Sequence, residues 1–316
     1  MRSKPKACLM GTLVLIVAIG TSTRFDAAPV EAQGADVNDH GTFTIIDVPG
    51  ASTNSALDIN AEGVIVGRYV TAGRTHGFVR SATGEFTTLD VPGSIFTSPT
   101  SINDRGDIVG QYALPTAPND RHGFLLKDGE FTSFDPPGSR FTNALAINER
   151  GDIVGRYCTV AKCTLPGTGV FHGFLLHDGE FTPIDVPGAI ETDAFGVNGR
   201  GAVAGGFLTS QNQEQIFVQG DDGFTVLALP GGQAVSLDKG SINERGDVVG
   251  AYCNGAAPCL ITLTSSHGFL ISAGTFTPID ISGARATAAF GINARGDIVG
   301  AYSDGIRFHG FLLNVH

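Results

Sequence analysis

A phrase close to I-N-x-R-G-D-I-V-G-x-Y recurs along the chain and constrains its fold more than any other feature. Its anchoring asparagines lie 43 to 50 residues apart, at Asn60, Asn103, Asn148, Asn198, Asn243 and Asn293. Repetition at this period is typical of repeat architectures, in which each copy is one supersecondary unit. We therefore expect six copies of one unit.

Two further phrases recur in step with the first. The phrase G-x-F-T-x-x-D-x-P-G is anchored by Phe43, Phe86, Phe131, Phe181, Phe224 and Phe276. The phrase H-G-F-L-L begins at His76, His122, His172, His267 and His309, and Gln215 begins the remaining slot. Each copy thus holds four short apolar runs separated by N-x-x-G, D-G and similar turn residues, which predicts four strands joined by tight turns. With 44 glycines in 316 residues, the composition also favours many turns.

A unit of this length with four strands fits the blade of a β-propeller and is too long for one coil of a β-helix. The first copy of the repeat phrases, at 41–47, matches a fourth strand, whereas the last, from His309, matches a third strand. Pairing these two segments would close a ring and remove its exposed sheet edges. We predict an all-β, six-bladed β-propeller over residues 41–316, in which the N-terminal strand completes the last blade.

The first 32 residues predict export. Arg2, Lys4 and Lys6 precede an apolar run of 14 residues at 7–20. A helix of that length spans about 21 Å, which is short for a bilayer core of about 30 Å. Basic residues, a short apolar segment and small residues up to Ala32 together indicate a secretory signal peptide over 1–32, with a linker at 33–40. The alternative is an uncleaved anchor. We expect a secreted protein, extracellular or periplasmic, without a membrane span after cleavage.

Four cysteines lie beyond the signal peptide and form two close pairs, each of which follows a tyrosine. They are Cys158, Cys163, Cys253 and Cys259. Disulfides are the expected state in an oxidising compartment, and this placement favours Cys158–Cys163 and Cys253–Cys259. Zinc is the alternative, but no histidine joins either pair at zinc-ligand spacing, so we predict neither a metal nor another cofactor.

The charge excludes several partners. The whole chain carries a net charge of −11, and residues 33–316 carry −13 because the first 32 residues hold four basic and two acidic groups. Binding to a phosphate backbone or an anionic membrane requires a basic surface, so nucleic acids and anionic membranes are unsuitable partners.

The combined phrases resemble the extracellular repeat of the HAF family, which is named for a His-Ala-Phe triplet. Here the triplet is His-Gly-Phe, and it occurs five times beside the I-N-x-x-G-D-I-V-G phrase. The resemblance covers nearly all of the chain after the signal peptide. It implies a secreted bacterial repeat protein and supplies no catalytic residues.

The repeated histidines and aspartates are predicted to be structural. A histidine begins the third strand, and an aspartate ends the fourth strand of the same blade: His76 with Asp90, His122 with Asp135, His172 with Asp185, His267 with Asp280 and His309 with Asp47. In the fourth copy both are replaced, by Gln215 and Ala228. Joint loss indicates that each histidine hydrogen-bonds its own aspartate, which satisfies two partly buried polar groups. A catalytic His–Asp dyad in one blade is the alternative.

Arg-Gly-Asp occurs four times, beginning at Arg105, Arg150, Arg245 and Arg295. The triplet is known as an adhesion motif, but here it falls inside the predicted first turn. Glycine there supplies the positive φ angle that the turn needs, and aspartate begins the next strand. We predict a turn and not an adhesion site.

Function is expected where the copies differ. The long loops between the second and third strands form a variable rim on one face of the ring, at 113–121, 158–171, 208–215 and 253–266. Both cysteine pairs fall in these loops. A variable rim on a rigid scaffold is a common way to build a binding surface.

The central mouth of the ring is a second candidate. Five residues before the anchoring asparagines stand Ser55, Ser98, Asn143, Asp193, Asp238 and Ala288. Asp193 and Asp238 are the carboxylates of this set, and they come from neighbouring copies. Glu191 precedes Asp193 by two residues, and Lys239 follows Asp238.

These acidic residues have three interpretations. Neighbouring blades pack at about 10 Å, so Asp193 and Asp238 would be spaced as in a paired-carboxylate hydrolase. The second interpretation is that Glu191, Asp193, Asp238 and Lys239 bind a ligand or a cation. The third is a solvated polar rim.

We therefore carry two functions forward. The first is a secreted binding or scaffold module for an extracellular glycan or protein. The second is a hydrolase or lyase that acts on an extracellular polysaccharide through the acidic mouth. The sequence lacks a nucleophile elbow, a phosphate loop and a dinucleotide fingerprint, which favours binding.

Overall fold

The computed structural model describes residues 41–159, 163, 170–227, 229, 240–253 and 266–314. It also gives the bounds of three short strands: β1 (Leu15–Ile16), β2 (Val37–Asn38) and β20 (Ala234–Val235). Every element in this described part is a β-strand, so the predicted all-β class is confirmed. Within the same residues, none of the segments is a helix of the length and hydropathy needed to cross a membrane.

Each repeat of the sequence forms its own antiparallel strands. The first repeat holds β4 (Thr53–Ile59), β5 (Ile65–Thr71), β6 (Arg74–Arg80) and β7 (Phe86–Leu89). The second holds β8 (Phe96–Ile102), β9 (Ile108–Leu114), β10 (Ala117–Lys127) and β11 (Glu130–Phe134), and β1 pairs with β11. The third holds β12 (Phe141–Ile147), β13 (Ile153–Cys158), β14 (His172–His177) and β15 (Glu180–Ile184).

The later repeats follow the same plan. The fourth holds β16 (Glu191–Val197), β17 (Val203–Leu208), β18 (Glu214–Gly220) and β19 (Gly223–Leu227). The fifth holds β20, β21 (Ser241–Ile242), β22 (Val248–Cys253), β23 (His267–Ser272) and β24 (Thr275–Ile279). The sixth holds β25 (Ala286–Ile292), β26 (Ile298–Ser303) and β27 (Phe308–Asn314), and β27 pairs with β3 (Gly41–Ile46) from the start of the described chain.

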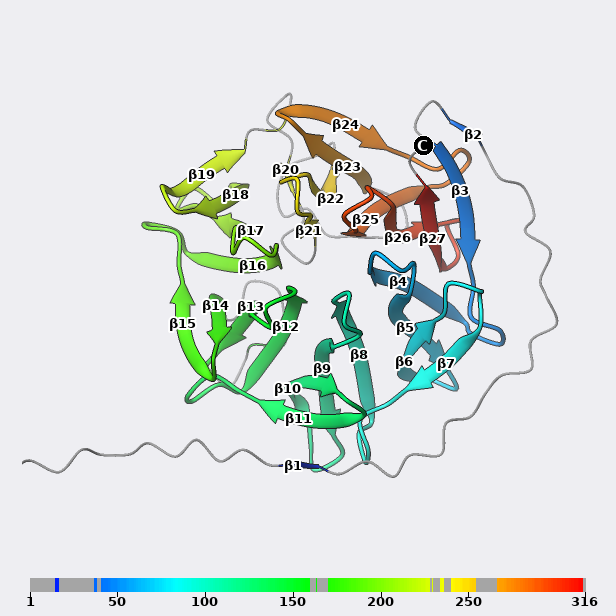
Figure 1. Cartoon of the computed structure of the whole chain (residues 1–316), viewed down its shortest axis with the longest axis horizontal. Helices are drawn as coiled ribbons and strands as arrows, with labels where there is room; N and C mark the ends of the chain where they lie inside the picture. The colour runs from blue at the N-terminus through cyan, green and yellow to red at the C-terminus, as the bar shows by residue number, and fades with distance from the viewer. Residues whose placement is uncertain are drawn as a thin grey trace, which may run out of the picture.

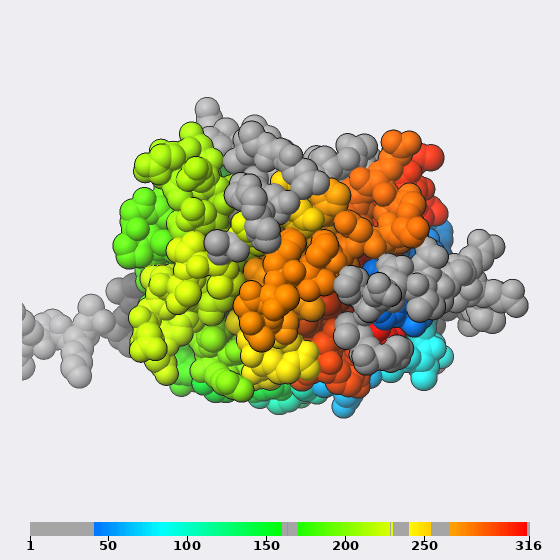
Figure 2. Space-filling view, turned by 90° about the horizontal axis from the view of Figure 1, so that it is seen from above, coloured from blue at the N-terminus to red at the C-terminus, as the bar shows by residue number. Residues whose placement is uncertain are grey.

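These sheets are arranged as a propeller. Figure 1 shows them around a central axis, with β4, β8, β12, β16, β21 and β25 nearest the axis and the fourth strands outermost. The side view shows neighbouring repeats packed side by side in chain order (Figure 2). The pairing of Phe43 with Leu313 and of Ile45 with Phe311 joins the first long strand to the last.

A glycine and a phenylalanine form the core of each repeat. The phenylalanine of the H-G-F phrase is almost completely buried in every copy, at Phe78, Phe124, Phe174, Phe217, Phe269 and Phe311. Each lies opposite the glycine of I-V-G on the second strand, as Phe174 lies opposite Gly155. A Cβ atom on Gly155 would lie 2.1 Å from the Asn143 carbonyl oxygen and 2.8 Å from the Phe174 ring. The repeat therefore requires glycine there because the ring occupies the space of a side chain.

The anchoring asparagines are linked in a closed ring of hydrogen bonds, which we call the Asn ring. The Nδ2 group of each donates to the main-chain carbonyl oxygen of the next repeat's asparagine, over 2.9 to 3.3 Å, and Asn293 donates to Asn60. The Oδ1 atom of each accepts the main-chain N–H groups two and four residues later, as Asn148 does from Arg150 and Asp152. One side chain thus shapes its own turn and ties it to the next repeat.

The connections divide the molecule into two faces. The N-x-x-G turns and the turns between the third and fourth strands lie on one face, because antiparallel strands that they join end there. The longer connections between the second and third strands lie on the other, which we call the loop face. The Asn ring surrounds a shallow depression of about 90 Å³ at the turn face.

Replacing Asn148 with alanine is expected to lower the free energy of unfolding by about 3 kcal/mol. The change leaves two main-chain N–H groups and the carbonyl oxygen of Asn198 without their hydrogen-bond partner in a buried place. Urea unfolding of the purified protein measures the effect. The exposed Asn119→Ala is the control, expected within about 0.5 kcal/mol of the unchanged protein. Equal effects of both substitutions would contradict a stabilising Asn ring.

Candidate functional site

A cavity of about 280 Å³ lies on the propeller axis. Its polar lining comes from the first three repeats: Ser55, Arg68, Ser98, Thr100, Gln111, Asn143 and Arg156. Its apolar lining is Leu57, Leu145, Phe290, Ala301 and Phe308. Ser55, Ser98 and Asn143 are three of the positions that the sequence predicted near the channel entrance, and they lie in the halves of β4, β8 and β12 nearer the loop face.

The cavity exists because two columns of residues change size around the ring. The first column holds the residues five positions before the anchoring asparagines, on the first strand of each repeat. The second column holds the residue x of the G-x-Y phrase, on the second strand, directly across the hairpin from the first column. Opposite pairs are Ser55 with Arg68, Ser98 with Gln111, Asn143 with Arg156, Asp193 with Gly206, and Ala288 with Ala301. Large polar side chains in the first three repeats therefore face glycine and alanine in the later ones, which leaves space on the axis.

Three polar side chains of this lining are buried without satisfying their hydrogen-bonding groups. Ser98 is 0% exposed, Asn143 5% and Gln111 9%. The Ser98 hydroxyl, the Asn143 Oδ1 atom and the Gln111 Oε1 atom have no hydrogen-bond partner among the residues that the structure describes. A buried polar atom without a partner costs about 1–3 kcal/mol, so three of them around one cavity need an explanation. A ligand that pairs with them is such an explanation.

The carboxylate of Asp193 is used inside the protein and not by the cavity. Asp193 is completely buried, and one of its oxygens accepts a hydrogen bond from Arg156 at 2.8 Å. The Arg156 guanidinium also lies 4.7 Å from the centre of the Phe171 ring. Asp193 is not among the residues that line the cavity, whereas Arg156 is. The carboxylate thus balances and orients an arginine of the cavity wall.

Of the remaining residues of the predicted acidic mouth, the structure describes Glu191, which does not line the cavity. Glu191 begins β16, where it is half-buried opposite Leu208. Asp238 and Lys239 lie outside the described residues. In the fourth repeat Thr192 lies opposite Phe207 and precedes the anchoring Asn198 by six residues. In the fifth repeat the equivalent residue is Val235, opposite Tyr252, and it precedes Asn243 by eight residues. Counting back from Asn243 therefore cannot place Asp238 in the column.

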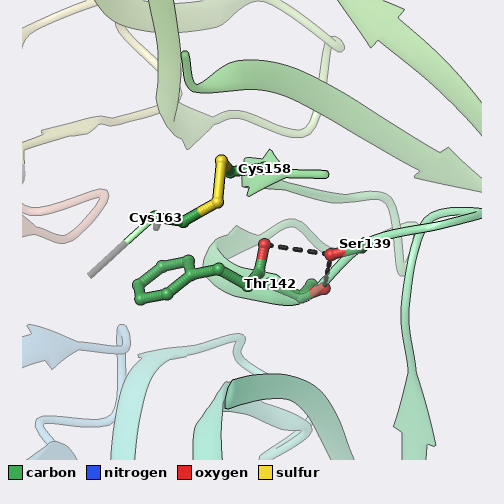
Figure 3. The surroundings of a disulfide bond; sticks show 5 residues. Ser139, Thr142, Cys158 and Cys163 are labelled. Carbon is green, nitrogen blue, oxygen red and sulfur yellow. Dashed lines mark hydrogen bonds between the residues drawn. A yellow bond between two sulfur atoms is a disulfide. The ribbon is translucent and has the colours of Figure 1, made fainter. Parts of the chain in front are cut away.

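The Cys158–Cys163 disulfide is confirmed and lies behind this wall. It closes the loop after β13, and Figure 3 shows it near Ser139 and Thr142, whose hydroxyl groups are hydrogen-bonded. Both cysteines pack with Phe171, the residue beneath the Arg156 guanidinium, and with Phe141. Cys253 is also disulfide-bonded, and Cys259 lies outside the described residues. The first disulfide therefore supports an arginine of the cavity.

The histidines of the H-G-F phrase are hydrogen-bonded through Nδ1 to the aspartates that the sequence paired with them. The shortest distances are 2.6 Å for His76–Asp90, 2.7 Å for His122–Asp135, 3.1 Å for His172–Asp185, 3.0 Å for His267–Asp280 and 2.9 Å for His309–Asp47. A tyrosine of the second strand also packs against each histidine ring. In the fourth repeat Phe207 lies opposite Gln215, and Ala228 lies outside the described residues. The pairs thus form the repeating architecture of the loop face.

The Arg-Gly-Asp triplets lie in the N-x-x-G turns. Their glycines have positive φ angles, as Gly151 does at 89°. In each triplet the arginine pairs with the aspartate, as Arg150 pairs with Asp152 at 2.7 Å, and the aspartates are 3–6% exposed. These carboxylates are turned inward, toward the asparagine that anchors the turn.

The rim loops are described in part. The loop at 113–121 turns at Pro115 and Thr116 and continues directly into the long strand β10, and the loop at 208–215 turns before β18. Most of the loop at 253–266 and most of the loop at 158–171 lie outside the described residues. Among the described residues there is also no group of three or more His, Cys, Asp or Glu side chains spaced to hold a metal ion.

Sequence reasoning missed four of the seven polar residues of the lining, Thr100 and three from the second strands. Arg68, Gln111 and Arg156 stand at the x of the G-x-Y phrase, where the later copies have Gly206, Ala251 and Ala301. That disagreement among copies was a readable signal. It indicates a site only once the hairpin register is known, because the register places these residues across from Ser55, Ser98 and Asn143.

Comparison with known proteins identifies the fold alone. No family model matches the sequence, and a search of curated proteins gives no match either. The β-propeller domain of the trilobed protease from Pyrococcus furiosus matches with a TM-score of 0.52 and 8% identity, covering 83% of this chain and 96% of that one. A protein named as a gluconolactonase matches with a TM-score of 0.51 and 13% identity, covering 91% and 94%. The fucose-specific lectin from Aleuria aurantia matches with a TM-score of 0.50 and 11% identity, covering 83% and 93%.

The Asp193→Asn substitution is expected to lower the free energy of unfolding by about 3–5 kcal/mol. It removes the negative charge of the carboxylate that accepts a hydrogen bond from Arg156, whose side chain is 15% exposed. The double variant Arg156→Met, Asp193→Leu is expected to recover part of this loss. Asp120→Asn is the control, because Asp120 pairs with Arg140 at an exposed place and its loss costs at most about 1 kcal/mol. Equal effects of Asp193→Asn and Asp120→Asn in urea unfolding would contradict the buried ion pair.

The stability of the protein is expected to fall as pH rises above about 6.5, in part through His122. Its hydrogen bond to Asp135 raises the pKa of His122 above the ordinary value of 6.5, despite partial burial. The charged ring therefore stabilises the fold fully below pH 6.5, and this contribution is lost as pH rises through the raised pKa. His122→Gln, which imitates Gln215, should flatten the profile of unfolding free energy against pH. Lys127→Gln should leave its slope unchanged, and a similar flattening in both would contradict this role.

Proposed function

We propose that the protein is a secreted binding propeller that takes a small ligand into its axial cavity from the loop face. The observation that carries this proposal is the convergence of buried polar side chains without partners, among the described residues, on one cavity with apolar walls. Small-molecule sites are typically concave and largely apolar, with a few placed polar groups. The cavity of about 280 Å³ has this composition.

Binding is favoured over hydrolysis by the position of the charges. Glycoside hydrolases typically use two carboxyl groups at a set separation beside the scissile bond. The lining of the cavity contains no carboxylate in the described part of the chain, and Asp193 is held by Arg156. The described part of the wall is therefore suited to hold a ligand by hydrogen bonds, and it presents neither the acid nor the base of that reaction.

We further propose that the ring has six blades and is closed by β3. The Asn ring, in which the last asparagine donates to the first, and the pairing of β3 with β27 support this architecture. A closed ring leaves no sheet edge exposed and gives the axial cavity a continuous wall.

The resemblance to HAF-family repeats and the Cys158–Cys163 disulfide support an extracellular or periplasmic location, with residues 1–32 as the signal peptide. The ligand would then be met outside the cytoplasm, as a free small molecule or as the end of a glycan. A fucose-specific lectin shares the propeller fold, so the fold is compatible with glycan binding. A protein partner on the rim is the second candidate.

The test is a broad ligand screen on the purified protein with its disulfides intact. Sugars, polyols, amino acids, organic acids and nucleosides are scored by thermal shift, and polysaccharides by array binding and by release of reducing ends. We expect at least one small ligand to bind saturably, without turnover.

A matched pair of variants locates the site. Ala301→Leu places a larger side chain in the cavity and is expected to weaken binding at least about tenfold, which corresponds to about 1.4 kcal/mol. Ala82→Leu makes the same change in an exposed turn and should leave affinity unchanged. Equal affinity in both variants would place the ligand elsewhere, and turnover of a polysaccharide would favour the hydrolase.

A further inference from the structure

We infer that the ligand of the axial cavity is an uncharged, polyhydroxylated molecule of the size of one sugar ring. This inference rests on the proposed function, because it names the ligand class of the same cavity. It is argued from the hydrogen-bonding groups of the wall, its charge balance, its apolar side and its volume.

The unpaired groups of the wall require a ligand that both donates and accepts hydrogen bonds. Two of the three atoms are carboxamide oxygens, on Gln111 and Asn143, and these need donors. The third is the Ser98 hydroxyl, which can donate or accept. A carboxylate, sulfate or phosphate offers no donor to a carboxamide oxygen, and an ammonium group offers no acceptor to a hydroxyl donor. Alcohol hydroxyl groups supply both functions.

The charge of the described wall excludes a cationic ligand. No carboxylate lines the cavity in the described part of the chain, so nothing there would balance a cation. The charge of Arg156 is already balanced by Asp193 at 2.8 Å. The guanidinium groups of Arg68 and Arg156 both line the cavity, and hydroxyl oxygens accept hydrogen bonds from guanidinium donors.

An apolar side complements the polar one. Both aromatic side chains of the lining, Phe290 and Phe308, come from the sixth repeat, whereas Asn143 and Arg156 come from the third, which also contributes Leu145. Figure 1 shows these two repeats on opposite sides of the axis. A pyranose or cyclitol ring has hydroxyl groups at its edge and C–H bonds on its faces, so it can meet both sides at once. An acyclic polar metabolite leaves the phenylalanines without an apolar partner.

The volume and the closed end limit the ligand to one ring. Small-molecule pockets usually span about 300–1,000 Å³, and this cavity of about 280 Å³ is slightly below that range. The Asn ring crosses the other end of the axis with its side-chain hydrogen bonds. A polysaccharide chain therefore cannot pass through, and a sugar enters end-on, as a free molecule or as a terminal residue.

The experiment compares matched ligands by isothermal titration calorimetry. The panel holds neutral hexoses, fucose, N-acetylglucosamine and inositol. It also holds the corresponding uronic acids and amino sugars, which differ by one charge. We expect saturable binding of at least one neutral ring, and binding at least about tenfold weaker for its charged counterparts.

Variants of the unpaired amides supply a second readout that needs no ligand. Gln111→Leu and Asn143→Leu replace a buried polar group by an apolar one. They are expected to raise Tm by about 2 °C or more while weakening neutral-sugar binding at least about tenfold. Gln213→Leu, in the exposed loop before β18, is the matched control and should change neither quantity. A purely structural role for the amides predicts the opposite, a fall in Tm with affinity unchanged.

The outcomes separate this inference from the proposed function. A ligand that binds in the cavity but is charged, or lacks hydroxyl groups, overturns the inference and leaves the binding propeller standing. A fall in Tm for both leucine variants also overturns it. If no compound of the broad screen binds and Ala301→Leu merely stabilises the protein, the proposed function fails as well.

Discussion

The hydrogen bonds of the Asn ring are the constraint on which the rest of the molecule depends. Every anchoring asparagine uses Oδ1 to hold its own turn and Nδ2 to reach the carbonyl oxygen of the next repeat. A single bond of this kind contributes about 1 kcal/mol, but the bond from Asn293 to Asn60 can form only when all repeats are in place. The ring therefore couples the two ends of the described chain, as the pairing of β3 with β27 does at the outer edge. Together with the other bonds of the Asn ring, these two contacts fix the distance of the innermost strands from the axis.

Fixing that distance also determines the space on the axis. At the turn face the asparagine side chains fill the centre, and only a shallow depression remains. Nearer the loop face, the space along the axis is filled by the side chains of the two facing columns, one on the first strand of each repeat and one on the second. Arginine, glutamine and asparagine in the early repeats meet glycine and alanine in the later ones, so the cavity is a result of unequal repeats on an equal scaffold. The buried phenylalanines and their glycines keep that scaffold the same in every repeat.

The repeating features could be predicted from the sequence, because each depends on contacts inside one copy. The strands, the turns at the Arg-Gly-Asp triplets and the partners of the five histidines follow from phrases that recur with fixed spacing. The candidate site depends instead on contacts between copies. Asp193 was expected at the channel mouth, but Arg156 of the preceding repeat turns its carboxylate into an internal ion pair, and no spacing within one copy reveals that partner. Gln111 and Arg68 were missed because their place beside Ser98 and Ser55 requires the register of the hairpin. Asp238 could not be placed by counting, since the fifth repeat has additional residues before Asn243.

The cost of the unpaired polar groups bears on why the scaffold is so repetitive. Ser98, Gln111 and Asn143 each forfeit about 1–3 kcal/mol while their groups are unpaired, which is a large share of the 5–15 kcal/mol that stabilises an ordinary domain. A fold that met this cost at its centre would loosen unless other interactions held the centre in place. Here the Asn ring, the core phenylalanines and the ion pair of Arg156 with Asp193 surround the cavity with satisfied contacts. The unpaired groups of Ser98, Gln111 and Asn143 lie in one wall, where a ligand can pair with them and offset the stability that they cost.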